Sequence, residues 1–494
     1  MEANRDGIIF WSVIIYLLIC VVVGIWALRR TKSSHDFFMA GRDLGIMLTA
    51  FAIFSSTLSG FGFVGGPGLV YKMGMSSVWM VVCAGFGYII SFALLGKRIR
   101  LFAELRECIS LPDVVVARYK SPSVAISVSV AIILGVLGYL ASQIKAMAVV
   151  MQDILDKDGF FPDISLEMCV LVSCAVLVFY TVSGGIIASV YTDLIQGVVM
   201  VIAAILVFAT VVMSFSDGMT EISTTIMQDD AEAIGPWGTL GMIGCLSWFF
   251  LFGLGGSGQP HVITKSMMNK NIRDARFILP VSTMGYFLAA LLWIGIGLAV
   301  RALVVGGTLD PLANADAAAP IFLQKYAHPL LAGVVFAGLF AAIMSTADGF
   351  LNIGTAAVIH DIPKALKGKA IGNELFWART VTVIIAVVSS LFALYSGDLV
   401  ALLGAFGWGT FAAALVPVVA IGINWKRATP LAANVAVISS LAINFIFKAF
   451  KIGLPYNIDA GAFALVVSMS LFIGISLASD PPALDPDVER VMDM

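Results

Sequence analysis

The chain has 494 residues, of which 60% are hydrophobic and 12% are charged, and its mean hydropathy is +0.99. Soluble domains carry about 25% charged residues, so this composition excludes an ordinary soluble protein and indicates a membrane protein with many spans. The net charge of −2 gives no reason to expect nucleic acid as a partner. The six cysteines form no CxxC pair and no cluster with histidine, which argues against a disulfide framework and against a His/Cys metal site.

Thirteen spans are predicted, because a helix needs roughly 20 apolar residues to cross a bilayer. In chain order they cover 8–28, 45–71, 76–96, 122–152, 164–183, 187–214, 238–259, 276–300, 329–358, 376–396, 399–423, 430–447 and 460–478. The first is expected to stay in the mature protein, since it leads into Arg29-Arg30 with no small-residue cleavage site. The segment after 478 is expected to be a short, disordered tail with no appended regulatory domain.

The distribution of Lys and Arg predicts the orientation of these spans. With the N-terminus outside, 21 of the 29 basic residues fall in inside loops and 7 in outside loops, while Lys145 lies within a span. Positively charged loops stay on the cytoplasmic side. We therefore expect the N-terminus outside and the C-terminus in the cytoplasm.

Two predicted spans are interrupted by glycine and proline. "FSSTLSGFGFVGGPG" (54–68) breaks the second span, and "FGLGGSGQPH" (252–261) breaks the end of the seventh. Unpaired backbone survives at membrane depth only where it lines a cavity inside the protein. Five spans separate the breaks, and five is odd, which predicts two repeats of opposite topology with a binding site between their broken helices. The alternative is close helix packing through small residues.

Two further stretches carry polar side chains inside apolar helices. Ser345 and Thr346 are adjacent hydroxyls in "FAAIMSTADGFLN" (340–352), and with the Ala342 carbonyl they offer three oxygens to a hard cation. The alternative is that each hydroxyl bonds its own helix backbone. Asp193 lies in "GGIIASVYTDLIQG" (184–197), where an acid is a functional candidate and stabilisation of a helix N-terminus is the competing interpretation. Asp348 shares the face of Ser345.

Four stretches in order resemble the sodium:solute symporter family over about residues 8–480. They are "DFFMAGRDLG" (36–45), "GGIIASVYTDLIQ" (184–196), "GQPHVITKSM" (258–267) and "AAIMSTADG" (341–349), and the third is most similar to the sodium/proline branch. The resemblance implies an all-α fold of five-plus-five inverted repeats, with one extra helix before them and two after. The corresponding segments are an N-terminal helix and loop (1–44), the first repeat (45–214), an external loop (215–237), the second repeat (238–423), two extra helices (424–478) and the tail (479–494).

The resemblance also implies sodium as the coupling ion. Its characteristic ion site falls on Ser55, Leu58, Ala342, Ser345 and Thr346, and Asp193 corresponds to a second ion site or to the inner ion route. The solute is expected beside the two breaks, and the candidate residues are Thr57, Ser59, Gly60, Phe252, Gly256, Ser257 and Pro260.

Departures from the proline branch affect the substrate prediction. Proline carriers that resemble this chain have an aspartate at the position of Thr57, and a tryptophan and a tyrosine at those of Phe252 and Gly256. A glycine at 256 is expected to leave room for a bulkier solute.

The sequence therefore predicts a sodium-coupled importer of a small organic solute, not an enzyme. An amino acid such as proline is the first choice, and a monocarboxylate, pantothenate or a sugar is the alternative. A proton-coupled carrier and a solute sensor on a transporter scaffold remain as other classes. The expected location is a bacterial inner membrane, where a monomer suffices for transport.

Overall fold

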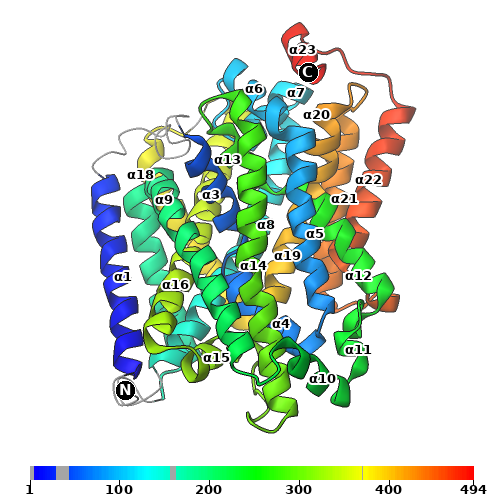
Figure 1. Ribbon diagram of the computed structural model, residues 1–494. Helices are drawn as coiled ribbons and strands as arrows, with labels where there is room; N and C mark the ends of the chain where they lie inside the picture. Colours follow the sequence, from blue (N-terminus) through cyan, green and yellow to red (C-terminus); the bar gives the residue numbers. More distant parts are fainter. Residues whose placement is uncertain (1–4, 29–43, 156–162, 370) are drawn as a thin grey trace.

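The computed structural model describes residues 5–28, 44–155, 163–369 and 371–494. Long helices run roughly parallel from one end of the molecule to the other, and the two chain ends lie at opposite ends of this bundle (Figure 1). The family's characteristic stretch at 36–45 lies almost entirely outside the described residues. The same holds for Arg29 and Arg30.

The first half of the chain is helical throughout the residues that the structure describes, apart from short turns. Its helical elements are α1 (Arg5–Leu28), α3 (Ile46–Thr57), the π-helical turn η3 (Phe61–Gly65), α4 (Gly66–Met73), α5 (Ser76–Ser91), η4 (Phe92–Gly96), α6 (Lys97–Leu105), α7 (Leu111–Tyr119), α8 (Pro122–Leu155), α9 (Leu166–Met213), α10 (Met219–Asp229) and α11 (Ala231–Ile234).

The second half begins with η5 (Gly238–Leu240) and ends with a short helix after the last span. Its elements are α12 (Met242–Trp248), η6 (Phe249–Gly253), η7 (Leu254–Gly258), α13 (Pro260–Met267), η8 (Ile272–Asp274), α14 (Ala275–Val305), η9 (Ala315–Ala317), α15 (Ala318–Tyr326), α16 (Pro329–Ala356), η10 (Ala357–Asp361), α17 (Ile362–Lys367), α18 (Glu374–Tyr395), α19 (Val400–Leu415), η11 (Val416–Ile421), α20 (Gly422–Asn424), α21 (Pro430–Ala449), η12 (Pro455–Asn457), α22 (Ala460–Ala478) and α23 (Pro486–Met492).

Membrane-spanning character is clear for most of the predicted spans. Within the described ranges, nine helices are long and apolar enough to cross a membrane, and a tenth arises when the bent pair 46–57 and 61–73 counts as one span. The helix α9 covers two predicted spans. A helix of its 48 residues would be about 72 Å long, more than twice the thickness of the hydrocarbon core. The helix α9 therefore contains two separate apolar segments, Leu166–Phe179 and Thr192–Met213.

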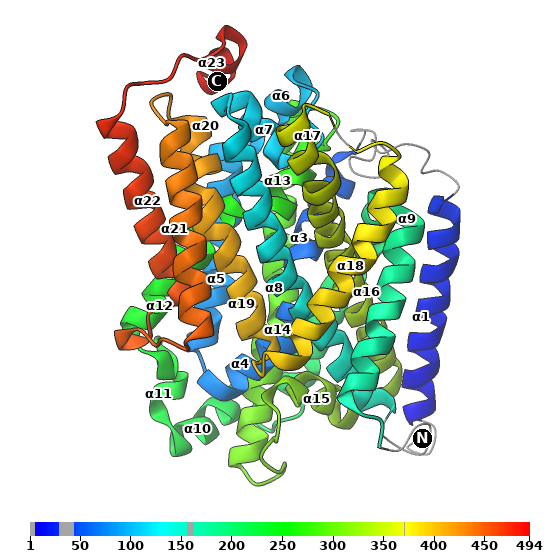
Figure 2. The same cartoon turned by 180° about the vertical axis from the view of Figure 1, so that it is seen from behind.

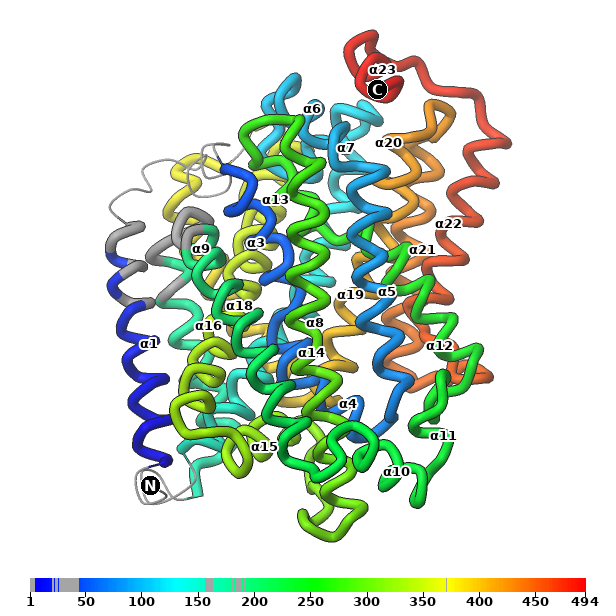
Figure 3. The backbone as a smooth tube through the Cα atoms, in the orientation of Figure 1, coloured from blue at the N-terminus to red at the C-terminus, as the bar shows by residue number. Residues whose placement is uncertain are grey.

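The centre of the bundle is formed by contacts between the two halves. Helix α8 packs against α19, α16 packs against α9, and α3 packs against α13, α14 and α9. Figures 2 and 3 show α19 and α8 in the middle of the molecule, with α21 and α22 on one flank and α1 on the other. The broken elements α3 and α13 lie next to each other in this centre.

The first interruption is real and lies after α3. Leu58 has φ −93° and ψ 74°, which ends the helix, and the chain resumes as a π-helical turn at Phe61 with a bend of 47°. Glycine is required where the resumed helix passes its neighbours. A Cβ at Gly66 would lie 2.1 Å from the Trp293 ring, and one at Gly60 would lie 2.6 Å from the Cβ of Ala146.

The second interruption is also present, and its glycines pack against α5 and α19. The chain passes from the π-helical turn η6 to the 3₁₀ turn η7, and Gln259 is extended before α13 begins at Pro260. A Cβ at Gly256 would lie 2.6 Å from the Cα of Gly87 in α5. The expectation that Gly256 leaves room for a bulkier solute is therefore wrong, because the backbone of α5 fills that space.

The expectation of a disordered tail is wrong as well. Helix α23 folds back onto the bundle with Val488, Val491 and Met492 buried. Ion pairs join Asp485 to Arg106 at 2.8 Å and to Lys120 at 2.6 Å. An apolar face with flanking acids gives the tail a docking surface that composition alone does not reveal.

Gly256→Ala is expected to lower the thermal unfolding midpoint of the purified protein, because its new methyl group overlaps the backbone of Gly87. Overpacking of this kind costs about 1–3 kcal/mol. Gly474→Ala is the control, since nothing lies within 4 Å of its added Cβ and alanine favours a helix over glycine. Equal midpoints for the two variants would contradict the close approach of η7 and α5.

Candidate functional site

Three of the five residues predicted for the ion site meet at the Thr346 hydroxyl. Its Oγ1 lies 3.0 Å from the carbonyl oxygen of Ala342, 3.2 Å from that of Ser56 and 3.4 Å from that of Ser55. The structure thus joins α16 to the end of α3 at full burial, with oxygens from both helices facing one point. Hard cations bind such sets of carbonyl and hydroxyl oxygens.

Leu58 and Ser345, the other two residues of the predicted set, are placed differently. The ψ of 74° at Leu58 turns its carbonyl out of the helical ladder of α3 at the break. Ser345, next to Thr346 on α16, donates a hydrogen bond to Oδ1 of Asp193 on α9. The structure therefore connects the predicted ion residues to Asp193, and the alternative that Asp193 merely stabilises a helix N-terminus is not what its contacts show.

Lys265 is the partner of Asp193 that the sequence reasoning missed. Its Nζ lies 3.1 Å from Oδ2 of Asp193 and 2.7 Å from the carbonyl oxygen of Ala52. Lys265 is 2% exposed and Asp193 is 0% exposed. Counting Lys265 as an inside-loop charge is wrong, because it belongs to α13 and points into the protein. Its place four residues after the second break is the signal that could have identified it.

Aromatic rings fill the space between the two breaks. Phe61 stacks on Phe252 with centroids 6.2 Å apart, and Phe252 lies 5.5 Å from Trp408. Tyr139 is 6.2 Å from Phe61 and 6.3 Å from the ring of His261. The predicted residue Phe252 thus lies among rings from η3, α8, α13 and α19.

Polar groups without partners lie among these rings. Oε1 of Gln259 and Nδ1 of His261 are buried and make no hydrogen bond, while the buried hydroxyls of Ser59 and Tyr139 lie against each other. Thr57 contacts Nε2 of His261 at 3.3 Å. A buried polar atom without a partner costs about 1–3 kcal/mol, so such a cluster indicates groups that are free to bind something else.

The other predicted solute residues divide into two groups. The amide of Gly60 donates to Oε1 of Gln143 at 3.1 Å, which places the first break against α8. Ser257 bonds the carbonyl of Leu254 in its own turn at 2.7 Å, and Pro260 starts α13. The region between the two breaks therefore contains Thr57, Ser59, Gly60 and Phe252. The hydroxyl of Ser257 instead bonds a carbonyl of its own turn. Gln143 was missed, although an amide in the middle of an apolar helix is a visible signal.

A second polar cluster lies beside Asp193. The carboxylate of Asp348 is buried, and the hydroxyls of Thr181 and Ser189 lie against it as donors. The amide of Asn352, one turn further along α16, is buried without a hydrogen-bond partner. The predicted shared face of Ser345 and Asp348 is confirmed by the proximity of both to Asp193.

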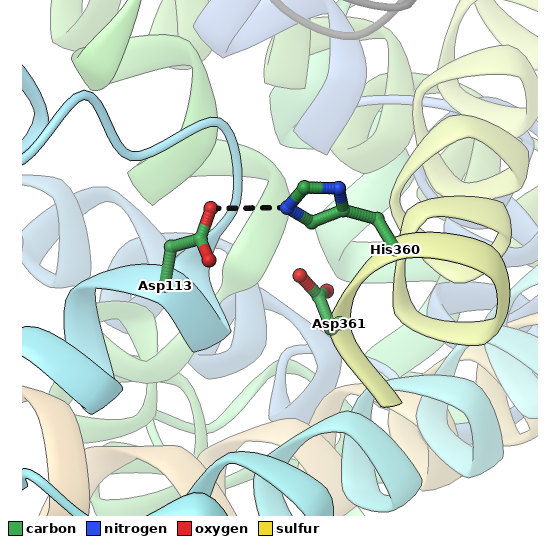
Figure 4. Close-up of side chains that lie close together, drawn as sticks. All are labelled: Asp113, His360 and Asp361. Carbon is green, nitrogen blue, oxygen red and sulfur yellow. Dashed lines mark hydrogen bonds and ion pairs between the residues drawn. The ribbon is translucent and has the colours of Figure 1, made fainter. Parts of the chain in front are cut away.

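A charged network closes the end of the bundle where α7 meets the end of α16. Nε2 of His360 lies 3.3 Å from Oδ2 of Asp113, and Ser110 donates to Asp361 at 2.5 Å. Figure 4 shows the Asp361 side chain close to Asp113 and His360. Ligand atoms of these three residues lie within 4.8 Å of one another, but the ammonium of Lys364, 2.7 Å from Oδ1 of Asp113, already supplies a cation.

This closing network lies over a cavity that leads toward the central site. The cavity is lined by Ser110 and Asp361 at one end and by His261, Lys265 and Asn352 at the other. Burial acts to raise the pKa of Asp113, but the contacts with His360 and Lys364 outweigh it, and the pKa falls to about 2. Asp113 is therefore a carboxylate at neutral pH and holds α7 against η10 and α17.

Comparisons with known proteins agree on one family. Residues 37–439 match the model of the sodium:solute symporter family. The chain is 26% identical to the osmoregulated proline transporter OpuE of Bacillus subtilis and 28% identical to a sodium/proline symporter of Haemophilus influenzae. Each alignment covers 95% of this chain and 94% of the relative.

Solved structures give the same fold. A substrate-bound, outward-open Na⁺-coupled sialic acid symporter superposes with a TM-score of 0.76 at 20% identity, covering 97% of this chain and 99% of that chain. The nucleobase-cation-symport-1 family transporter Mhp1 superposes with a TM-score of 0.57 at 14% identity, covering 92% of this chain and 98% of that one. At these identities the likeness establishes the fold.

Asp113→Asn is expected to destabilise the purified protein by about 2 kcal/mol at pH 7, because charged hydrogen bonds to His360 and Lys364 are lost. Since the native pKa is lowered, the contribution of the carboxylate is complete above about pH 4 and disappears as the pH falls toward 2. Thermal unfolding at pH 7 measures the effect. Asp310→Asn, at an exposed position, is the control, and an equal midpoint for both variants would contradict the network.

Proposed function

The chain belongs to the sodium:solute symporter family, and on this premise we propose which residues bind the ion and which bind the solute. The protein is a secondary transporter that couples uptake of a small solute to sodium, and it is not an enzyme. Its coupling ion is Na⁺.

Sodium binds between the end of α3 and the middle of α16 in this proposal. The ligands are the carbonyls of Ser55, Leu58 and Ala342 with the hydroxyls of Ser345 and Thr346. The observation that carries the proposal is the position of the Thr346 hydroxyl, within 3.4 Å of carbonyls on both helices. An ion placed there stabilises one mutual arrangement of the two repeats, which is how ion binding shifts the population of states.

Asp193 lies on the ion's route away from this site. It shares Ser345 with the ion ligands, and the cavity lined by Lys265, Asn352 and Asp361 continues from there to the network of Asp113 and His360. We assign this end to the cytoplasm. Without the buried Lys265, the basic residues still divide 20 inside and 7 outside, which places the N-terminus outside. Each sodium ion that enters gains about 2.3 kcal/mol per 100 mV of membrane potential.

The solute binds between the two breaks, and a small amino acid such as proline fits best. The buried polar atoms there belong to the side chains of Ser59, Tyr139, Gln259 and His261, and the surrounding rings are apolar. Such a lining suits a small molecule with an apolar body and no net charge. The relatives at 26–28% identity are named as proline transporters. Thr57, Gly60 and Phe252 complete this site, while Gly256, Ser257 and Pro260 shape the break behind it.

A bacterial inner membrane is the proposed location, and a monomer contains every residue of both sites. The bacterial relatives support this location. The expected alternative of a proton-coupled carrier gives way to sodium coupling. A sensor would bind solute in sodium without moving it.

Ser345→Ala combined with Thr346→Ala is expected to raise the sodium concentration for half-maximal uptake by at least about tenfold, because two cation-binding oxygens are removed. Sodium-dependent uptake of labelled solute into proteoliposomes measures this. Ser440→Ala is the control, since it removes another buried serine hydroxyl that bonds its own helix backbone. An unchanged sodium dependence in the double variant would refute the ion site.

Proline is expected to raise the thermal unfolding midpoint of the purified protein in sodium but not in matched potassium. A ligand at 100 times its Kd stabilises the folded state by about 2.7 kcal/mol. The same scan includes other small amino acids, monocarboxylates, pantothenate and sugars. A shift with one of these and none with proline would reassign the substrate. Equal shifts in both salts would favour the proton-coupled or sensor function.

A further inference from the structure

Lys265 places a positive charge where a cation beside Asp193 would bind. Its ammonium contacts Oδ2 of Asp193 at 3.1 Å and the carbonyl oxygen of Ala52 at 2.7 Å. The other carboxylate oxygen, Oδ1, accepts the hydrogen bond of Ser345. A carboxylate and a backbone carbonyl are also the oxygen types that a hard cation takes.

The ammonium and a sodium ion exclude one another at this position. A free cation that bound both Oδ2 of Asp193 and the Ala52 carbonyl would have to lie where Nζ of Lys265 lies. Both side chains are buried, at 2% exposure or less, so solvent cannot replace either partner. Removing one member of a buried ion pair leaves a charge that is strongly unfavourable without a new counter-ion.

We infer that Lys265 is a built-in counter-ion of Asp193 that takes the place of a second sodium ion. The inference rests on the proposed function, in which the sodium that drives uptake binds at Ser55, Ala342 and Thr346. Two roles were expected for Asp193, a second ion site and the inner ion route, and this inference assigns it to the inner route. This acid lines the ion route and keeps Lys265 in place, and it does not hold a transported sodium ion of its own.

Asp348 is the other acid in this buried cluster. It remains unchanged in every variant of the test, so its own occupancy adds equally to each measurement. Differences between variants therefore report on Asp193 and Lys265 alone.

The test is equilibrium binding of ²²Na⁺ to the purified full-length protein, which needs no knowledge of the solute. Lys265→Gln is expected to bind one more sodium ion per protein molecule than the unmodified chain, because Asp193 then needs a new counter-ion. Lys265→Arg keeps the positive charge and is expected to bind the same number as the unmodified chain. Lys265→Gln combined with Asp193→Asn removes both charges and is also expected to match it.

Two results would overturn the inference. One is an equal sodium count for folded Lys265→Gln and the unmodified chain. The other is a count lower by one in the uncharged double variant, which would mean that Asp193 itself holds a sodium ion. If Lys265→Gln fails to fold, the double variant alone decides, because its two neutral side chains keep the original sizes. Failure of the proposed function gives a different result, namely that the unmodified chain binds no sodium.

Discussion

The buried ion pair of Lys265 and Asp193 connects the elements on which the central site depends. Lys265 belongs to α13, Asp193 to α9, Ser345 to α16 and the Ala52 carbonyl to α3. A charge in an apolar interior is stable only when it is paired and hydrogen-bonded. These four helices are therefore held in one arrangement by a single network, which lies directly beside the oxygens around Thr346.

The two broken helices follow from the same requirement. Backbone groups at membrane depth need partners, and the breaks obtain them from other helices: Gly60 bonds Gln143 on α8, and Trp408 on α19 bonds the carbonyl of Leu251. Glycine makes this possible, because side chains at Gly60 or Gly256 would collide with α8 or α5. What remains between the breaks is a set of aromatic rings with a few buried polar side chains, and the proposed solute site rests on this chemistry.

Charged groups are concentrated where the site meets the end of the bundle. Asp113, His360, Asp361 and Lys364 join α7 to the end of α16, above a cavity that reaches Lys265 and Asn352. Nearby, α23 is held by ion pairs to Arg106 and Lys120. Alternating access requires this end to open, and the partly exposed ion pairs there are individually weak enough to break and re-form as the helices move.

Much of the architecture was determined by sequence alone. Apolar run length predicts most of the spans, and clustered glycine and proline mark both breaks, because these are local properties of the backbone. The hydroxyls of Ser345 and Thr346 and the acid at Asp193 stand out for the same reason, as polar groups in apolar helices. Only the tertiary structure decided which polar groups meet. Lys265 looked like a loop charge, Gly256 looked like free space, and Asp113 is 247 residues from His360. Their roles come from contacts between distant helices, and no local pattern records which side chain faces which.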